Sequence, residues 1–279
     1  MSRRPNPRAR ERAELAVNLD EPELSFVMPC YNEQEVIPFT IPAFCDAFAR
    51  AGVRLELVAC DNGSKDRTGE ILRALQAKGY PIVVHRVEPN EGYGNGVLKT
   101  FPVCRAPWIG VIPCDGQVDP EDVVKLFQAL RFTDGKLIGK VRRRFRMDGP
   151  LRKVVSVLYN ALVFALYPGL GSIDVNGSPK ILHREVLRRL DLQSKRWFLD
   201  PELMIKAHYL GVRVLEMNVF ARMRGAGLSH VRASTCLEFF TNLISYRFGS
   251  ALSEWRKRAE PLPAGPLHVI NEYELPSAR

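Results

Sequence analysis

Short apolar runs alternate with polar loop motifs along the first half of this chain. Four such motifs follow four apolar runs, at residues 28–33, 60–68, 90–96 and 113–120. The stretches between the motifs have the length and pattern of helices. Strands that alternate with helices predict a largely parallel sheet with helices on both faces. Open sheets of this kind bind ligands at the edge where the carboxyl ends of the strands meet. The order of the motifs therefore predicts an α/β fold and the place of its site.

The pattern also gives approximate bounds for the elements. We expect strands over residues 24–28, 55–60, 82–87 and 108–112, and helices over residues 36–50, 68–78, 96–104 and 121–131. Gly79 is a typical helix terminator, and Asp119-Pro120 is a typical helix start. A run of arginines between positions 142 and 146 then leads into an apolar helix from Arg152. After it we expect a strand near Ile181, a helix over 200–210 and a strand over 213–219.

The charge of the chain restricts its partners. Its 279 residues carry a formal net charge of +9, which favours an anionic partner such as nucleic acid, acidic lipid headgroups or a phosphorylated substrate. The sequence contains neither a recognition helix nor a basic ribbon interleaved with aromatic residues, so we do not expect nucleic acid to be the partner. Residues 1–22 are polar and rich in arginine, and they predict a flexible basic arm.

The cysteines and the apolar stretches indicate the compartment. Six cysteines are present, but no two of them form a C-x-x-C pair, so a zinc site is not expected. The arginine-rich N-terminus lacks the apolar core of a signal peptide, which favours a reduced, cytoplasmic compartment. Residues 154–167 are the most apolar stretch, but they fall short of the about 20 residues of a membrane span. They fit a buried helix, a helix at the membrane surface, or a homodimer interface.

Three of the motifs carry groups that suit a nucleotide and a cation. Asp61 ends a strand, where a carboxylate can accept hydrogen bonds from a nucleobase or ribose, or form an ordinary Asx turn before a helix capped by Asp66 and Thr68. Residues 90–96 form a glycine-rich turn, which lets backbone approach phosphate at a helix N-terminus. Asp115 and Gln117 offer two oxygen ligands for Mg²⁺ or Mn²⁺, which substrate phosphate would have to complete. The alternative is a simple Asp-Gly turn.

The second half of the chain offers weaker patterns. Arg152, Ser156 and Asn160 recur every four residues and form one polar line on a helix, which suits a phosphate monoester or a surface stripe. Asp200 and Glu202 open a helix, where they stabilise the helix dipole or act as a base. Residues 224–229 form a basic, flexible segment that suits a pyrophosphate leaving group or an ordinary loop.

The ordered set of motifs resembles the family 2 glycosyltransferases with a GT-A fold, and especially the branch of polyprenyl-phosphate sugar synthases. The resemblance covers about residues 24–235 and rests on the number and order of the motifs. The matching segments are P-x-Y-N-E at 29–33, D-N-G-S-x-D-x-T at 61–68, N-x-G-x-G at 90–94, D-G-Q-x-D-P at 115–120, R-x-x-x-S-x-x-x-N at 152–160, D-V-N-G-x-P-K at 174–180, D-x-E at 200–202 and R-x-x-G-x-S at 224–229.

This resemblance implies metal-assisted transfer of a sugar from a nucleotide-diphosphate donor to an acceptor, with inversion at the anomeric carbon. It implies a mixed, mainly parallel GT-A sheet in one domain over residues 23–235. Residues 23–131 would bind the nucleotide sugar and residues 132–235 the acceptor. Residues 236–279 would form a C-terminal helix and a Pro-rich tail.

The resemblance also assigns roles to single residues. The expected donor-binding residues are Pro29, Tyr31, Asn32, Glu33, Asp61, Asn62, Asn90 and Gly92. Asp115 and Gln117 would bind the divalent cation, Arg152 and Ser156 the acceptor phosphate, and Arg224 and Ser229 the leaving group. The expected catalytic residues are Asp115, Asp200, Glu202 and Arg224. A cation and an arginine stabilise charge on the departing diphosphate. A phosphate acceptor needs alignment, whereas a hydroxyl acceptor needs a base, for which Asp200 or Glu202 is the candidate.

Two departures from the family pattern define the alternatives. Pro113 stands where the family's metal motif has its first carboxylate, and proline cannot bind a metal. The 279 residues also contain no C-terminal membrane spans of the kind that many relatives carry. The resemblance favours a polyprenyl phosphate acceptor, met peripherally at the inner face of the membrane, whereas the two departures favour other readings. The alternatives are a soluble small molecule with a hydroxyl or amine, or a protein that binds nucleotide sugar without turnover.

Overall fold

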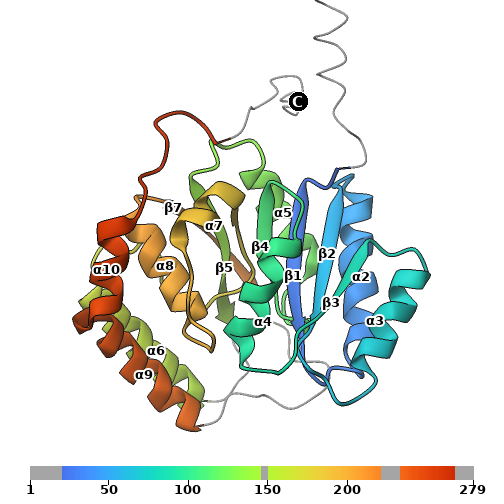
Figure 1. The fold of residues 1–279 in the computed structure, drawn as a ribbon, viewed down its shortest axis with the longest axis horizontal. Coiled ribbons are helices and arrows are strands. Elements are labelled where there is room, and N and C mark those ends of the chain that lie inside the picture. Colours follow the sequence, from blue (N-terminus) through green and yellow to red (C-terminus); the bar gives the residue numbers. More distant parts are fainter. Residues whose placement is uncertain (1–20, 146–149, 221–232, 268–279) are drawn as a thin grey trace, which may run out of the picture.

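The computed structural model describes residues 21–145, 150–220 and 233–267, and only the backbone of residues 143–145, 150–156 and 233–237. Its strands are β1 (Leu24–Cys30), β2 (Leu55–Asp61), β3 (Ile82–Arg86), β4 (Trp108–Val111), β5 (Leu137–Phe145), β6 (Lys180–His183) and β7 (Arg213–Phe220). They form one sheet in the order β3-β2-β1-β4-β6-β5-β7 (Figure 1).

The sheet is mixed but mainly parallel, as the sequence predicts. β1 pairs in parallel with β2 and β4, β2 with β3, and β5 with β7. β6 is antiparallel to both of its neighbours, β4 and β5. β1, β2 and β4 are buried along almost their whole length, as expected of central strands covered on both faces.

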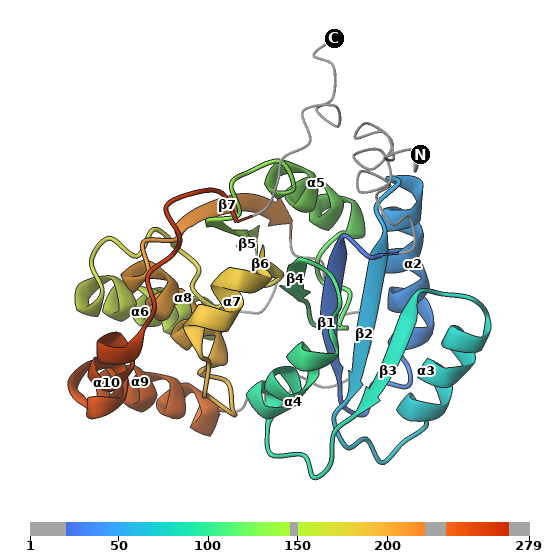
Figure 2. The same ribbon diagram turned by 45° about the horizontal axis from the view of Figure 1, so that its top comes forward.

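Helices cover both faces of this sheet. They are α2 (Ile37–Arg50), α3 (Thr68–Ala77), α4 (Tyr93–Thr100), the 3₁₀ helix η1 (Phe101–Val103), α5 (Pro120–Leu130), α6 (Pro150–Leu166), α7 (Arg184–Leu190), α8 (Leu199–Tyr209), α9 (Ala233–Phe248) and α10 (Ser250–Arg258). α2, α3 and α5 pack on one face, and α4, α7 and α8 pack on the other. α6, α9 and α10 gather at the end of the molecule that lies opposite α3 (Figure 2).

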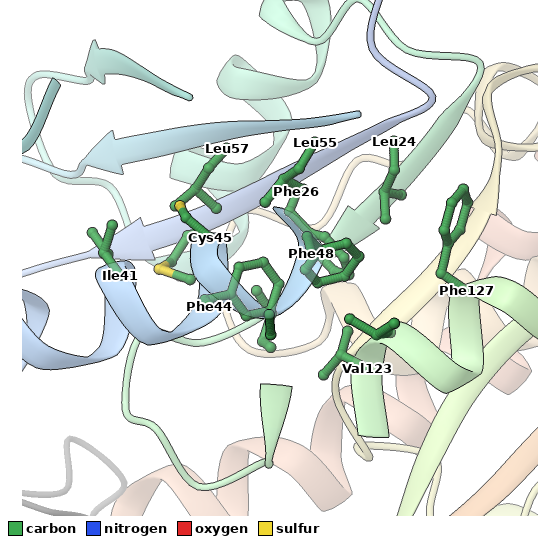
Figure 3. Close-up of a cluster of buried hydrophobic side chains, with 14 of the residues drawn as sticks. Leu24, Phe26, Ile41, Phe44, Cys45, Phe48, Leu55, Leu57, Val123 and Phe127 are labelled. Atoms are coloured by element: carbon green, nitrogen blue, oxygen red, sulfur yellow. The ribbon is translucent and has the colours of Figure 1, made fainter. Parts of the chain in front are cut away.

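The alternation of side chains along β1 separates the two cores. Phe26 faces the first core, where its ring meets the ring edges of Phe44 and Phe48 on α2, with centroids 5.2 and 6.0 Å apart (Figure 3). Val27, the next residue, belongs to the second core. This period of two is the normal consequence of the strand pleat, and it fixes which helices face which side.

Several local predictions are confirmed. α5 begins at Pro120, and the Asp119 carboxylate accepts a hydrogen bond from the backbone N–H of Glu121 at 3.1 Å. α3 ends shortly before Gly79, whose φ of +90° suits glycine. Cys30, Cys60 and Cys114 are buried free thiols near the strand ends.

Two predictions need correction. The helix expected over 96–104 is α4, which begins earlier, at Tyr93, and ends at Thr100. The arginine run that was expected only to lead into a helix belongs largely to β5, because backbone pairing with β7 continues through Arg143. Helix α7, which the sequence patterns did not predict, follows β6 directly.

Candidate functional site

The carboxyl ends of β1, β2 and β4 lie side by side at one edge of the sheet. In the register of the sheet, Cys30 is opposite Asp61, and Val27 is opposite Val111. The loops that follow these strands therefore start next to one another. This arrangement brings together the P-x-Y-N-E, D-N-G-S and D-G-Q motifs, which are far apart in the sequence.

The P-x-Y-N-E loop is fixed to the loop that precedes α3. Five hydrogen bonds join them: Asn32 N to Ser64 Oγ (3.1 Å), Lys65 N to Asn32 Oδ1 (2.8 Å), Glu33 N to Thr68 Oγ1 (2.9 Å), Gln34 N to Asp66 Oδ2 (3.2 Å) and Arg67 N to Gln34 Oε1 (3.1 Å). Asn32 has a φ of +53°, a conformation that asparagine tolerates better than most residues. The loops thus form one rigid wall beside Pro29 and Tyr31.

Asp66 caps the start of α3, as expected. Its Oδ1 accepts a hydrogen bond from the backbone N–H of Thr68 at 3.0 Å. Partial burial raises the pKa of Asp66, but the hydrogen bonds from Thr68 and Gln34 together outweigh this and leave the pKa below its usual value. The Thr68 hydroxyl, in contrast, serves the P-x-Y-N-E loop by accepting from Glu33.

Asp61, the expected nucleoside ligand, lies at the floor of this wall. Its side chain is 1% exposed, and its two oxygens accept hydrogen bonds from Ser64 N at 3.0 Å and from Arg86 Nη1 at 2.5 Å. Arg86 is half exposed and also contacts Glu88. The sequence predicts the carboxylate at this position. The structure shows in addition that the guanidinium of Arg86 lies between this carboxylate and the solvent.

The glycine-rich motif lies directly beside Asn62. The Asn62 amide donates to Asn90 Oδ1 at 3.3 Å and to the carbonyl of Gly92 at 3.1 Å. Gly92 has a φ of +123°, which requires glycine. A side chain at Gly94 would collide with the carbonyl oxygen of Ser194, and one at Gly96 with the side chain of Asn62. These glycines serve close packing at the start of α4, which explains why α4 begins earlier than expected.

The candidate cation ligands lie in the loop after β4. Asp115 Oδ1 accepts a hydrogen bond from the backbone N–H of Gln117 at 3.1 Å, across Gly116 with a φ of +67°. Both side chains line one cavity, together with Pro113. Over residues 21–145, 150–220 and 233–267, no group of three His, Cys, Asp or Glu side chains could hold a metal. A carboxylate and an amide oxygen suit a hard cation shared with phosphate oxygens.

Asp200 lies at the start of α8, next to the glycine-rich motif. It forms an ion pair with Lys180, which is fully buried, and a hydrogen bond with the Tyr93 hydroxyl. Burial and the Asp200 carboxylate raise the pKa of Tyr93 well above its usual value. The Tyr93 ring stacks on Trp197, with centroids 5.0 Å apart. These contacts join the first half of the chain to the second at the edge of the site.

Glu202 has a different environment, although it is only two residues away. Its buried carboxylate pairs with Lys206 Nζ at 2.6 Å and accepts backbone hydrogen bonds from Gln193 and Ser194. The next residue, Lys195, accepts a hydrogen bond from Asn95 N through its carbonyl at 2.7 Å. This placement does not fit the role of a base that the sequence suggested for Glu202. The residue instead holds the segment on which the glycine-rich motif packs.

The remaining expected site residues are only partly placed. Arg224 and Ser229 lie outside the described residues, and so do the side chains of Arg152 and Ser156. The third member of their helical line, Asn160, accepts a hydrogen bond from the backbone N–H of Val175 at 3.3 Å. One face of α6 is thereby tied to the D-V-N-G segment.

The sequence analysis also missed Lys140, which is buried like Lys180 and Lys206. Lys140 in β5 is completely buried, and its Nζ donates to the carbonyl of Asp174 at 2.5 Å and to Glu216 at 2.7 Å. Burial lowers the pKa of Lys140 to about 8, with a contribution from nearby Lys180. The only signal for this role was a lysine between apolar residues in the segment 137–141.

Comparison with known proteins agrees with this arrangement. Residues 25–190 match the family model "Glycosyl transferase family 2". An uncharacterized glycosyltransferase of Mycobacterium tuberculosis is 28% identical over 211 residues, which are 76% of this chain and 90% of that protein. A dolichyl-phosphate beta-glucosyltransferase of Dictyostelium discoideum is 23% identical over 256 residues, which are 85% of this chain and 78% of that protein.

Solved structures share the fold. Glucosyl-3-phosphoglycerate synthase from Mycobacterium tuberculosis, in complex with Mn²⁺, uridine diphosphate and glucosyl-3-phosphoglycerate, superposes with a TM-score of 0.63 at 20% identity. The match covers 89% of this chain and 86% of that one. The sheet is therefore of the GT-A type, as the resemblance implied. Because the family model spans more than half of the sequence, the chain belongs to glycosyl transferase family 2.

Proposed function

We propose that this glycosyltransferase moves a sugar from a nucleotide-diphosphate sugar to a polyprenyl phosphate, with inversion at the anomeric carbon and with the help of Mg²⁺ or Mn²⁺. The observation that carries the proposal is the meeting of three motif loops at one sheet edge, with the D-G-Q loop among them. The Dictyostelium relative, named for transfer to dolichyl phosphate, supports the choice of acceptor.

The donor half offers a bound nucleoside a rigid wall. Asn32, Glu33 and the loop before α3 are held together by the hydrogen bonds described above, so little conformational entropy is lost when the base binds. At the end of β2, the half-exposed guanidinium of Arg86, which is held by buried Asp61, presents hydrogen-bond donors. The glycine-rich motif borders this wall, where Asn90 Oδ1 and the carbonyl of Gly92 hold the side chain of Asn62.

Asp115 and Gln117 fit a divalent cation that is shared with the donor diphosphate. Mg²⁺ usually binds proteins through one or two carboxylates, with substrate phosphates and water completing its shell. The cation would supply positive charge where negative charge builds on the leaving diphosphate. With Pro113 in place of a carboxylate, Asp115 is the carboxylate that this loop offers to a cation, because Asp119 caps α5.

The chemistry of the acceptor determines what Asp200 has to do. A phosphate monoester is already ionised at neutral pH and needs alignment against the anomeric carbon. In that case Asp200, held by Lys180 and Tyr93, fixes the geometry between the glycine-rich motif and α8. A hydroxyl acceptor would instead need Asp200 as its base, and that carboxylate is already engaged in the ion pair with Lys180.

Exposed apolar side chains support a lipid acceptor. Val157, Leu158 and Phe164 on α6 and Ile244 and Phe248 on α9 are exposed. These two helices lie at the end of the molecule opposite α3 (Figure 2). Among the described residues, no helix is long and apolar enough to cross a membrane. An exposed apolar face on a strongly basic protein suits the surface of an anionic membrane. A polyprenyl phosphate resides in such a membrane.

The test is a transfer assay with UDP-, GDP- and dTDP-sugars, each with undecaprenyl phosphate in vesicles, with and without Mn²⁺. We expect transfer from one donor, dependence on the cation, and a loss of about 100-fold in kcat/KM in D115A, comparable to the removal of one transition-state contact. The matched control is D122A, which removes a carboxylate of α5 that pairs with Lys125. Transfer to a soluble alcohol or amine, but not to the lipid, would reject the acceptor proposed here.

A further inference from the structure

A cavity of about 230 Å³ opens beside the candidate cation loop. It lies between the first turns of α2, the end of β1 and the loop after β4. Its apolar walls come from Met28, Phe39, Phe44, Ile112, Pro113 and Val118. The expected nucleoside ligands Tyr31, Glu33 and Asp61 are not among its lining residues. The cavity is therefore separate from the wall that would hold the nucleoside.

The polar side chains inside the cavity already have partners. The Thr40 hydroxyl donates to the carbonyl of Val36 at 3.2 Å, and the Ser178 hydroxyl donates to the carbonyl of Val111 at 3.1 Å. A buried water molecule usually needs about three hydrogen-bond partners. The inner part of the cavity offers mainly hydrocarbon surface, so it favours an apolar ligand over a hydrated one.

One side of the cavity is polar, and its apolar lining extends to the surface of the protein. Asp115 and Gln117, the candidate cation ligands, belong to its lining. Phe39 also belongs to the lining, and it is 76% exposed, which is unusual for a residue of its size. A ligand that fits both features has an anionic group near the cation loop and a hydrocarbon part directly attached to it.

Pro113 gives the cavity its apolar character at this point. The metal motif of the family has a carboxylate at this position, and a carboxylate in the wall would oppose the burial of hydrocarbon. Proline adds apolar surface instead. The same departure that removes one cation ligand therefore creates part of the apolar lining.

We propose that this cavity binds the hydrocarbon segment nearest the phosphate of a prenyl phosphate acceptor, with the phosphate beside Asp115 and its cation. This inference rests on the proposed function and specifies where its acceptor binds. The size is adequate, because an apolar protein cavity of about 150 Å³ is enough to hold benzene. The cavity accommodates the first part of a prenyl chain, and the remainder continues past Phe39 toward the surface.

The test fills the cavity with A43F. Ala43 lines the cavity on an exposed turn of α2, so a larger side chain there occupies the cavity without displacing the core. We expect the KM for geranyl phosphate to rise at least tenfold, while the affinity for the donor nucleotide with Mn²⁺ stays unchanged. The control A49F adds the same side chain to an exposed position near the end of α2 and should change neither value. An unchanged KM in a folded A43F protein would overturn the proposal.

A binding experiment separates this inference from the proposed function. If the wild type transfers sugar to no prenyl phosphate, the proposed function fails. Calorimetry then measures the affinities for geranyl phosphate and for inorganic phosphate in the presence of Mn²⁺. The comparison tests whether the cavity binds hydrocarbon. Tighter binding of geranyl phosphate, lost in A43F and kept in A49F, supports the cavity as a hydrocarbon site. Equal binding of the two phosphates rejects it.

Discussion

At the scale of single residues, the charged groups near the site divide into two kinds. Asp115 lies in the loop after β4 and Asp200 in the first turn of α8, and both are only partly buried. Asp61 at the end of β2, Glu202 and Lys140 are buried and hold backbone segments in place. We expect the first kind to meet a substrate directly and the second kind to act through the loops that it supports.

The buried pair of Glu202 and Lys206 provides the first prediction. In E202Q, Lys206 remains buried without its carboxylate partner, and breaking such a pair costs about 3–5 kcal/mol. We expect a smaller loss in K206M, because Glu202 keeps its hydrogen bonds from Gln193 and Ser194. The measurement is the free energy of unfolding from urea denaturation. Equal losses in the two variants would contradict the role assigned to Glu202.

Lys140 predicts a specific dependence of stability on pH. Its pKa is about 8 in the folded protein, against an ordinary value of 10.5. Between these values the unfolded chain binds more protons than the folded one, so this group makes the free energy of unfolding rise with pH. Below about pH 8 its burial is unfavourable by a constant amount.

The measurement compares wild type with K140M from pH 7 to 10.5. We expect the wild type to gain up to roughly 3 kcal/mol relative to the variant across this range. Methionine has a similar length and no titrating group, so the contributions of groups that do not contact Lys140 are shared. A difference that stays flat over the whole range would show that Lys140 does not titrate as described.

Pro113 provides a test of how the cation loop departs from its family. We expect P113D to bind Mn²⁺ more tightly in the presence of nucleotide, because it adds an oxygen ligand beside Asp115 and Gln117. The same variant should raise the KM for geranyl phosphate, because it places a charge in the wall of the apolar cavity. Calorimetry and steady-state kinetics measure the two effects. Weaker binding of the cation would argue against the proposed ligand set.

At the scale of elements, the site depends on the packing of α4 against the segment before α8. Gly92, Gly94 and Asn95 contact the backbone of residues 194–196, and Glu202 holds that segment from beneath. The Tyr93–Trp197 stack continues the same contact. The glycine-rich motif from the first half of the chain is thus supported by an element from the second half.

Gly94 tests this packing. Alanine normally favours a helix over glycine by about 1 kcal/mol, but a Cβ atom at position 94 would collide with the Ser194 carbonyl. We therefore expect G94A to be less stable than wild type and to bind the donor nucleotide at least tenfold more weakly, by thermal unfolding and calorimetry. The control is G265A, because the structure leaves open space around that glycine. A stabilised G94A protein would contradict the close contact.

At the scale of the whole molecule, five of the eight large apolar residues that are exposed in the described part of the chain lie on α6 and α9. Phe164 and Phe248 are 68% and 75% exposed. The formal net charge of +9 adds attraction to anionic lipid, which decreases with salt. An anionic membrane surface would cover the exposed apolar residues and would also attract the positive charge of the chain. A homodimer would cover the apolar residues but would gain nothing from the charge.

The double variant F164S/F248S distinguishes these two occupants. We expect it to bind vesicles that contain phosphatidylglycerol about tenfold more weakly than wild type, in a sedimentation assay at fixed salt. Turnover with water-soluble geranyl phosphate should stay near that of wild type, because neither residue lines the donor site or the cavity. Light scattering gives the opposing outcome: a wild-type dimer that the double variant dissociates would assign this face to a second copy of the chain.

Much of the fold follows from local patterns. The period of two in β1, the apolar spacing of Ile37, Ile41, Phe44 and Phe48 in α2, and the Asp119-Pro120 start of α5 all depend on residues within a few turns of one another. The motifs at the strand ends were predicted for the same reason, because a strand delivers the next residues to the edge of its sheet. The start of α4 was predicted wrongly, because glycines that usually form a loop pack there against residues 194–196.

The sequence by itself determined the order of the elements, the α/β class and the family, because these depend on local periodicity and on motifs of a few residues. Only the tertiary structure decided which charged residues are buried and paired. Lys180 meets Asp200 across 20 positions, and Lys140 meets Glu216 across 76. No local pattern distinguishes Asp200 at the edge of the site from Glu202 beneath it, because burial is a property of everything that packs around a residue.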